Sequence, residues 1–252
     1  MQQFATTPLT VHEVWSKAFQ LTCERWRSLY LLFVINQLII LLSVYLFVDP
    51  NKTMIDALRD QPVNTVLYFI ITGLITLFIY AVAYHQLGAY LQAKPLHFKD
   101  SMRMMLKKIP TLILAGILAL LLTVLGFAAL IIPGVFIVGA LFYYYPSLIV
   151  DNMSPAAALK YTLEIMWGQW WRSSYILMTP IFMAGVISSL FTLLILFLTM
   201  MIPAVNYISN YLTNIINILF QSYVNILLVA IQLIQWNNLK ILKATNASRS
   251  AL

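Results

Sequence analysis

Six continuously apolar runs dominate the pattern of hydrophobic and polar positions along this chain. They occupy residues 28–47, 66–91, 110–132, 134–150, 174–200 and 212–236, and the fourth run is short and abuts the third. A hydrocarbon core about 30 Å thick requires about 20 apolar residues in a helix, and the runs lack the alternating polarity of barrel strands. The pattern therefore predicts an all-α integral membrane protein with six transmembrane helices arranged as three hairpins.

Three segments outside these runs carry apolar positions at helical spacing. The first begins near Thr10, which forms a capping-box pattern with Glu13, and the third begins at Ser154, a predicted N-cap followed by Pro155. The apolar faces comprise Val11, Val14, Trp15, Ala18 and Leu21; Phe98, Met102, Met105, Leu106 and Ile109; and Leu159, Leu163, Met166, Trp167 and Trp170. Such faces are typical of helices in the membrane interface. We expect a cytoplasmic amphipathic interfacial helix before each two-span hairpin.

The junction between surface helix and span has similar sequences in two places. Residues 25–32 resemble residues 170–177 in the order of Trp, Arg, Ser, Tyr and aliphatic positions. This match suggests a single polytopic membrane domain, 1–252, with repeat units at 10–92, 97–150 and 154–236 and a cytoplasmic tail at 237–252. The alternative is that Trp and Arg occur at both junctions only because both residue types anchor helices at the membrane interface.

Composition agrees with a membrane protein, and the net charge of +7 adds an orientation. Apolar residues make up 62% of the 252 residues and charged residues only 9%, too few to cover a soluble surface. Thirteen of the 15 Lys and Arg residues flank the runs on one side, whereas Lys52 and Arg59 lie on the other. By the positive-inside rule, both termini are cytoplasmic. The basic excess is mainly a topology signal, and we expect no nucleic-acid partner.

The basic residues beside the runs are also candidates for binding anionic lipid headgroups of the cytoplasmic leaflet. The candidate contacts are Arg25, Arg27, Lys99, Arg103, Lys107, Lys108 and Arg172. The expected partners are therefore membrane lipids, with a second copy of the chain or another membrane protein as further candidates.

One stretch resembles a known family. Ile132, Pro133 and Gly134 are followed by Pro146 and then by Leu148, Ile149, Val150, Asp151, Met153, Ala157, Trp167 and Arg172. This pattern, over about residues 130–175, resembles the YciC family of bacterial multi-pass inner-membrane proteins. The resemblance implies a location in the bacterial cytoplasmic membrane, and it supplies no catalytic residues. From the residues themselves, Pro133 and Gly134 predict a tight turn on the outer face, and Pro146 predicts a kink in the fourth span.

Residues with catalytic or metal-binding chemistry are sparse. All eight carboxylates fall outside the apolar runs, whereas proton relays and coupled transporters place acids within the membrane. His85 lies near the inner end of the second run, where an interfacial role is favoured over a ligand role. Cys23 is the only cysteine, so the chain cannot assemble a thiolate metal cluster. We expect no enzymatic activity, no cofactor and no bound metal.

The last run carries an amide-rich face. Asn214, Asn217, Gln221, Asn225 and Gln232 follow one another at intervals of three, four, four and seven residues, and thus share one side of a helix. Unsatisfied amides are costly in hydrocarbon, so this face should point into the bundle, toward Asn36 and Gln37 of the first run. Such amides either order a helix bundle or line a polar path.

These observations lead to two functional hypotheses. The first is a non-enzymatic role in envelope organisation, or as an accessory to other membrane proteins, through surface helices that bind anionic lipids. The alternative is a transporter or flippase-like facilitator that moves a lipid or amphipathic small molecule along the polar face of the sixth span.

Overall fold

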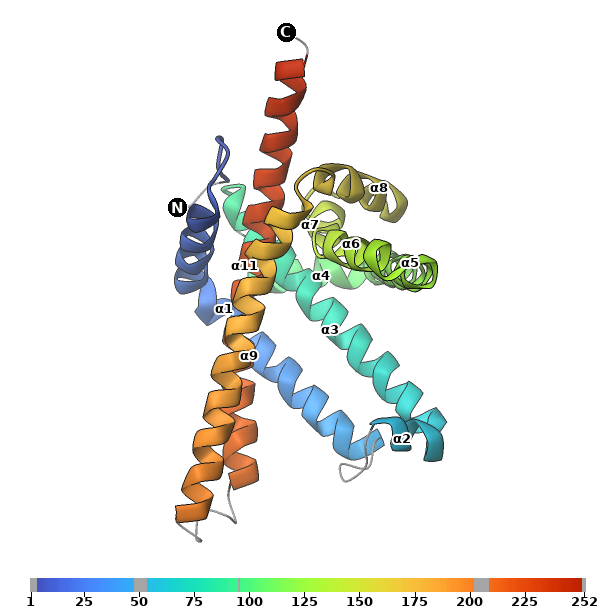
Figure 1. Cartoon of the computed structure of the whole chain (residues 1–252), viewed down its shortest axis with the longest axis vertical. Coiled ribbons are helices and arrows are strands. Elements are labelled where there is room, and N and C mark those ends of the chain that lie inside the picture. The colour runs from blue at the N-terminus through green and yellow to red at the C-terminus, as the bar shows by residue number, and fades with distance from the viewer. Residues whose placement is uncertain (1–3, 48–53, 95, 202–208, 251–252) are drawn as a thin grey trace. The chain divides into compact units, whose positions relative to one another are not determined.

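The computed structural model describes residues 4–47, 54–94, 96–201 and 209–250, and all regular structure in this part of the chain is helical (Figure 1). The helices are α1 (Val11–Phe47), α2 (Met54–Asp60), α3 (Pro62–Leu91), α4 (Phe98–Lys107), α5 (Ile109–Ala129), α6 (Ile131–Leu141), α7 (Tyr144–Ile149), α8 (Pro155–Met166), α9 (Trp170–Met201) and α11 (Ser209–Ser250).

Five helices in the described residues contain a stretch long and apolar enough to cross a membrane. These stretches are Leu29–Phe47, Pro62–Leu91, Ile109–Ala129, Trp170–Met201 and Tyr211–Ser248. In the described residues the all-helical prediction is confirmed, and the length and composition of these stretches support a membrane protein. The six-span arrangement is not confirmed, because residues 134–150 do not form one helix of spanning length.

The predicted fourth span is interrupted between α6 and α7. α6 ends at Leu141, the amide of Tyr143 donates to the carbonyl of Ala140 at 3.0 Å, and α7 begins at Tyr144. Pro146 has no N–H to donate to the carbonyl of Phe142, and its ring crowds that carbonyl, which favours a kink or a break at this point. With 11 residues, α6 is about 16 Å long, roughly half of a hydrocarbon core.

The connection between α5 and α6 also differs from the predicted turn. Pro133 and Gly134 lie inside the first turn of α6, and the only residue between the two helices is the extended Leu130. Gly134 instead permits close packing, since a Cβ added there would lie 2.6 Å from the ring of Phe127. The small residue therefore serves helix contact rather than chain reversal.

Helix α1 begins at the predicted capping box. The amide of Thr10 donates to Glu13 Oε2 at 2.6 Å, and the amide of Glu13 donates to Thr10 Oγ1 at 3.3 Å, which confirms the reciprocal pair. The first surface helix and the first span are one continuous helix of 37 residues. In α8, Ser154 occupies the N-cap position, but its side chain makes no capping hydrogen bond.

Contacts group the chain into two compact units, described separately below. Unit 1 comprises residues 1–25, 80–180 and 227–252, and unit 2 comprises residues 26–79 and 181–226. The divisions fall inside α1, α3, α9 and α11, so each of these helices contributes to both units. The divisions do not coincide with the boundaries of the predicted repeat units.

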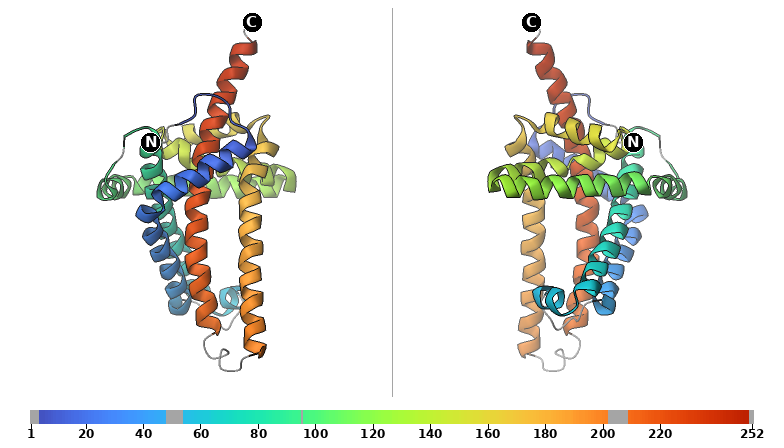
Figure 2. Two further views of the ribbon diagram at one scale, coloured as in Figure 1. Left: turned by 90° about the vertical axis from the view of Figure 1, so that its left-hand side faces the viewer. Right: turned by 90° about the vertical axis from the view of Figure 1, so that its right-hand side faces the viewer.

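Unit 1 is built around a hairpin. α5 and α6 pack against each other, and α8 packs against α5, α6 and α7. Within this unit, the hairpin lies crosswise to the beginning of α9 and the second half of α11 (Figure 2). α6, α8 and α11 are joined by a core of Ala140, Tyr143, Ile165, Met166, Trp236 and Leu239. α8 contributes Ala158, Thr162, Ile165 and Met166 to the buried interior, whereas Trp167 is exposed.

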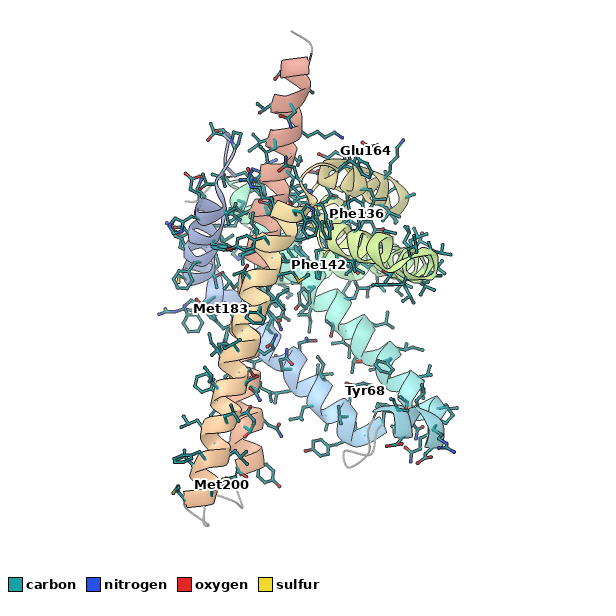
Figure 3. All side chains as sticks on the ribbon, in the orientation of Figure 1. Tyr68, Phe136, Phe142, Glu164, Met183 and Met200 are labelled. Carbon is teal, nitrogen blue, oxygen red and sulfur yellow. The ribbon has the colours of Figure 1, made fainter. Side chains whose placement is uncertain are left out.

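Unit 2 consists of helix segments with few buried side chains. Many apolar residues of α9 in this unit are exposed, and Met183 and Met200 project outward from the helix (Figure 3). In water such a surface would be a large unpaired apolar patch. Around a membrane-spanning helix, it is the surface expected to face lipid.

Candidate functional site

The second half of α11 is the polar centre of unit 1, although the sequence predicts a tail from residue 237. Trp236 is 1% exposed, and its indole N–H donates to Ser147 Oγ of α7 at 2.9 Å. Gln235, also buried, donates from Nε2 to Ser173 Oγ of α9 at 3.0 Å. Because buried polar groups are costly without partners, these bonds fix α11 against two other helices.

The next two residues of α11 hold the N-terminal segment. Asn237 donates to the carbonyl of Ala5 at 3.0 Å. Asn238 accepts from the amide of Leu9 at 2.8 Å and donates to the carbonyl of Leu9 at 3.3 Å, so its side chain satisfies both backbone groups of one residue. Arg172 donates to the same carbonyl. A non-helical segment is thereby tied to α11 and α9.

Two ion pairs join α11 to the segment around α8. Lys240 contacts both carboxylate oxygens of Asp151, at 2.9 and 3.0 Å, and Lys243 contacts Glu164 at 3.0 Å. The ammonium group of Lys240 also lies 4.3 Å from the ring centre of Trp236. All four ionised side chains are partly exposed to solvent, so each pair contributes about 1 kcal/mol or less.

The predicted polar face of the last span divides between the two units. In unit 1, Gln232 accepts a hydrogen bond from the hydroxyl of the buried Tyr84. In unit 2, Ser188 of α9 donates to Asn217 Oδ1 at 2.7 Å, and Gln221 donates to Asn225 Oδ1 at 3.3 Å along α11. Asn225 is buried, and Asn214 is half-buried. Most of this face is therefore engaged with protein groups.

The predicted partners in α1 have a different contact. Asn36 is fully buried and accepts from Thr76 Oγ1 of α3 at 3.2 Å, while Gln37 is half-buried. This bond joins α1 to α3 within unit 2.

The predicted lipid contacts on α4 form an exposed basic face. Lys99, Arg103 and Lys107 are all exposed, whereas Met105 is completely buried and Met102 is half-buried. Lys and Arg at this spacing lie on the same side of a helix. α4 therefore presents three positive charges away from the core of unit 1, together with the single exposed carboxylate of Asp100.

The other predicted lipid contacts have protein neighbours or lie apart from α4. Arg25 lies over the ring of Tyr90, 3.8 Å from its centre, and Arg27 is exposed beside Trp26. Lys108 donates to Asn152, and burial lowers the pKa of its ammonium group. Arg172 has the contact with Leu9 already described.

An aromatic groove lies where α8 meets α9. It has a volume of about 650 Å³ and is lined by Phe136, Trp167, Gly168, Gln169, Trp170, Trp171 and Arg172. Trp167 and Trp171 are 79% and 80% exposed. Because Trp170 and Trp171 begin a candidate span, these indoles have the position of interfacial anchors.

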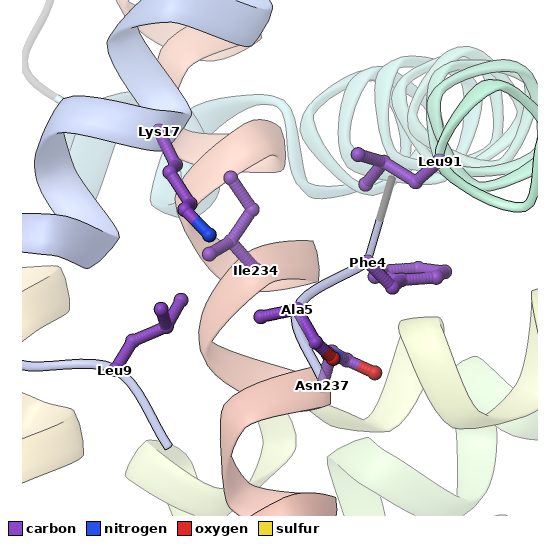
Figure 4. Close-up of a pocket in the computed structure, with 7 residues that line it drawn as sticks. All are labelled: Phe4, Ala5, Leu9, Lys17, Leu91, Ile234 and Asn237. Carbon is purple, nitrogen blue, oxygen red and sulfur yellow. The ribbon is translucent and has the colours of Figure 1, made fainter. Parts of the chain in front are cut away.

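A second cavity, beside the N-terminal segment, is much smaller. It is lined by Phe4, Ala5, Leu9, Lys17, Leu91, Ile234 and Asn237 (Figure 4). Its volume of about 10 Å³ is close to the space that one water molecule needs. It has no room for an organic ligand.

Neither metal-binding residues nor similarity to known proteins adds a function to this description. The described residues contain no group of three or more His, Cys, Asp or Glu side chains that could hold a metal ion. Comparison with known proteins found no matching family model, no similar curated protein and no similar solved structure.

Sequence reasoning missed the α11 centre and the aromatic groove as sites. The signal for the first was present, because Gln235 lies within the predicted span and Asn237 and Asn238 continue the series of amides beyond its end. The groove depends on Phe136, which lies 31 residues before Trp167 and has no local pattern in common with it.

Proposed function

We propose that the chain is a multi-pass protein of the bacterial cytoplasmic membrane, with both termini in the cytoplasm, that binds anionic lipid headgroups through α4. It acts without catalysis, in envelope organisation or as an accessory to other membrane proteins. The observation that carries this proposal is the exposure of Lys99, Arg103 and Lys107 on a helix whose Met105 is completely buried.

The distribution of charge supports the location and the orientation. Thirteen of 15 basic residues fall on the same predicted side of the spans as α4, and the positive-inside rule assigns that side to the cytoplasm. The resemblance of residues 130–175 to YciC proteins supports the same membrane. That side of a bacterial membrane carries the negative surface potential that attracts basic segments.

The expected attraction between α4 and anionic headgroups is strong enough for lipid selection. A basic residue near an anionic surface contributes about 1 kcal/mol, so three residues on α4 together favour anionic lipid substantially. Because the three side chains are exposed, salt should screen the attraction.

The carrier hypothesis has weaker support. Asn217 and Asn225 each accept a hydrogen bond from a protein side chain, which favours a role in helix packing over a polar path. We therefore propose no transport activity.

The test compares lipids retained by the purified protein from an equimolar mixture of phosphatidylglycerol and phosphatidylcholine, measured by native mass spectrometry. We expect the native chain to prefer phosphatidylglycerol, and the triple variant Lys99→Gln, Arg103→Gln, Lys107→Gln to lose about tenfold or more of that preference. Arg59→Gln, an exposed change on α2, is the matched control and should leave the preference intact. Equal lipid selection by the native chain and the triple variant would contradict the proposal.

A further inference from the structure

We infer that the α5–α6 hairpin does not cross the membrane but lies along it, inserted into the hydrocarbon of the single leaflet on the side of α4 and α8. This inference goes beyond the proposed function and does not depend on headgroup binding. The partner of the exposed face of the hairpin is the acyl-chain region of that leaflet.

The direction of the hairpin within unit 1 favours a position along the membrane. α5 and α6 run crosswise to the beginning of α9 and the second half of α11 in both views of Figure 2. α9 and α11 both contain candidate spans, and α5 is also long and apolar enough to cross, so direction rather than composition distinguishes it. If those helices cross the bilayer, a hairpin that runs crosswise to them lies along the membrane.

The hairpin tip has the chemistry of a segment in hydrocarbon rather than in water. No charged residue occurs between Lys108 and Asp151, and the tip contains Phe127, Leu130 and Ile131, where an exposed aqueous loop would carry polar side chains. Leu130 is the only non-helical residue between α5 and α6. Its amide donates to the carbonyl of Gly126, and its carbonyl accepts from the amide of Gly134, both at 3.2 Å. Irregular backbone is tolerated in hydrocarbon only when it is satisfied in this way.

The length of α6 and the exposed face of α5 agree with a position along the membrane. α6 alone can reach only about half of a hydrocarbon core, and the returning arm is interrupted before α7, so it is not one helix of spanning length. One side of α5 buries Leu112 and Ala115, while Leu114, Leu121 and Leu125 are exposed. These three residues lie within about 40° of one another around the helix. They form a continuous apolar strip with the chemistry of acyl chains.

The test measures the membrane depth of three spin labels on α5, in a Cys23→Ser background reconstituted into liposomes. Labels replace Leu114, Leu121 and Leu125, one per variant, and the accessibility ratio of oxygen to a polar nickel reagent reports depth. α9 offers matched controls at the same spacing, Phe182, Ser189 and Leu193, which are also exposed. The spacing corresponds to about 10 Å and then about 6 Å along a helix axis.

We expect the three α5 labels to report one depth, because they share a face of a helix that lies in the plane. The α9 labels should report different depths, with a maximum at position 189. A maximum at position 121 in α5, matching that in α9, would overturn the inference. All six positions are exposed, so the labels do not disturb the core.

A second measurement uses a membrane-impermeant thiol reagent on Leu130→Cys and Arg59→Cys. Position 130 should not react from the side that labels position 59, and reaction from that side would also overturn the inference. Which side labels position 59 tests the proposed orientation separately. A reversed orientation would contradict the proposed function and leave the hairpin inference intact.

Discussion

The two units differ most clearly in how much space surrounds the glycines inside their helices. In unit 1, a Cβ on Gly134 would lie 2.6 Å from the Phe127 ring, and one on Gly139 would lie 2.8 Å from Trp170 Nε1. In unit 2, Gly73 and Gly185 have no atom within 4 Å of such a Cβ. Unit 1 is packed like a protein interior, whereas unit 2 leaves room around its helices.

Their polar groups differ in the same way. In unit 1, Trp236, Asn238 and Lys240 bond to residues 89 or more positions away. In unit 2, Thr65, Thr72 and Ser222 each bond to the carbonyl four residues earlier in their own helix. Bonds to the same helix also occur in unit 1, as at Thr22 and Thr162, and unit 2 has bonds between helices at Asn36 and Asn217. Among the described residues, however, bonds between elements are concentrated in unit 1. The predictions below test this difference.

The largest effect is expected from Trp236→Ala in unit 1. The change removes a fully buried side chain and leaves the hydroxyl of Ser147 without its donor. We expect a loss of about 3–5 kcal/mol in the free energy of unfolding, measured by denaturant titration of the detergent-solubilised protein. Trp26→Ala in unit 2, where the side chain is 38% exposed, should cost about 1 kcal/mol or less. Equal losses would remove the distinction between the units.

Smaller effects on stability are expected at two glycines, and the two effects should have opposite signs. Gly134→Ala places a methyl group against the Phe127 ring and should destabilise the protein by about 1–3 kcal/mol. Gly185→Ala adds a methyl group to open space in a helix and should stabilise by about 0.5–1 kcal/mol. Thermal unfolding of the two variants measures the contrast. Destabilisation by Gly185→Ala would indicate packing around α9 that the native chain completes in the membrane.

The pair Gln221 and Asn225 tests packing against transport. Asn225→Leu leaves the Gln221 amide without its acceptor and should cost about 0.6–2 kcal/mol. The double variant with Gln221→Leu removes both partners, so its cost should be less than the sum of the single changes. Unfolding measurements on the three variants give the coupling energy. Additive stability effects, together with loss of lipid flux in liposomes, would instead favour the carrier hypothesis.

The smallest effect is expected at the start of α1. Hydrogen bonds from the backbone and then the side chain of Thr10 lower the pKa of Glu13 below 4.5. A carboxylate with a lowered folded-state pKa stabilises the protein above the unfolded-state pKa, and the contribution is lost as the pH falls through the folded-state pKa. Glu13→Gln should therefore lower the unfolding midpoint at neutral pH and have little effect well below pH 4.5. An equal difference at both pH values would assign the effect to something other than this charge.

Much of the fold could be predicted because hydropathy records where apolar helices are. It could not show that the run at 134–150 is divided, since the residues on both sides of Phe142 and Tyr143 are uncharged and mostly apolar. The charge pattern also does not distinguish a hairpin that crosses the membrane from one that does not. Lys108 and Asp151 lie on the same side whether the intervening segment crosses the membrane twice or not at all.

The candidate site was less predictable because its contacts are remote in sequence. The capping box of α1 is local and was predicted correctly. Asn238, in contrast, binds Leu9 across 229 positions, and no spacing rule connects the two. The drop in hydropathy after Trp236 predicted the end of a span, whereas α11 continues as a helix to Ser250.

The uncharged α5–α6 hairpin has a mechanical consequence for the bilayer. A helix about 10 Å wide and about 30 Å long, seated with α6 in one leaflet, enlarges the area of that leaflet and adds nothing to the other. Such an imbalance acts as a wedge. The membrane would bend so that the leaflet containing the hairpin becomes the convex one. The protein would then concentrate where the membrane is already curved in this direction.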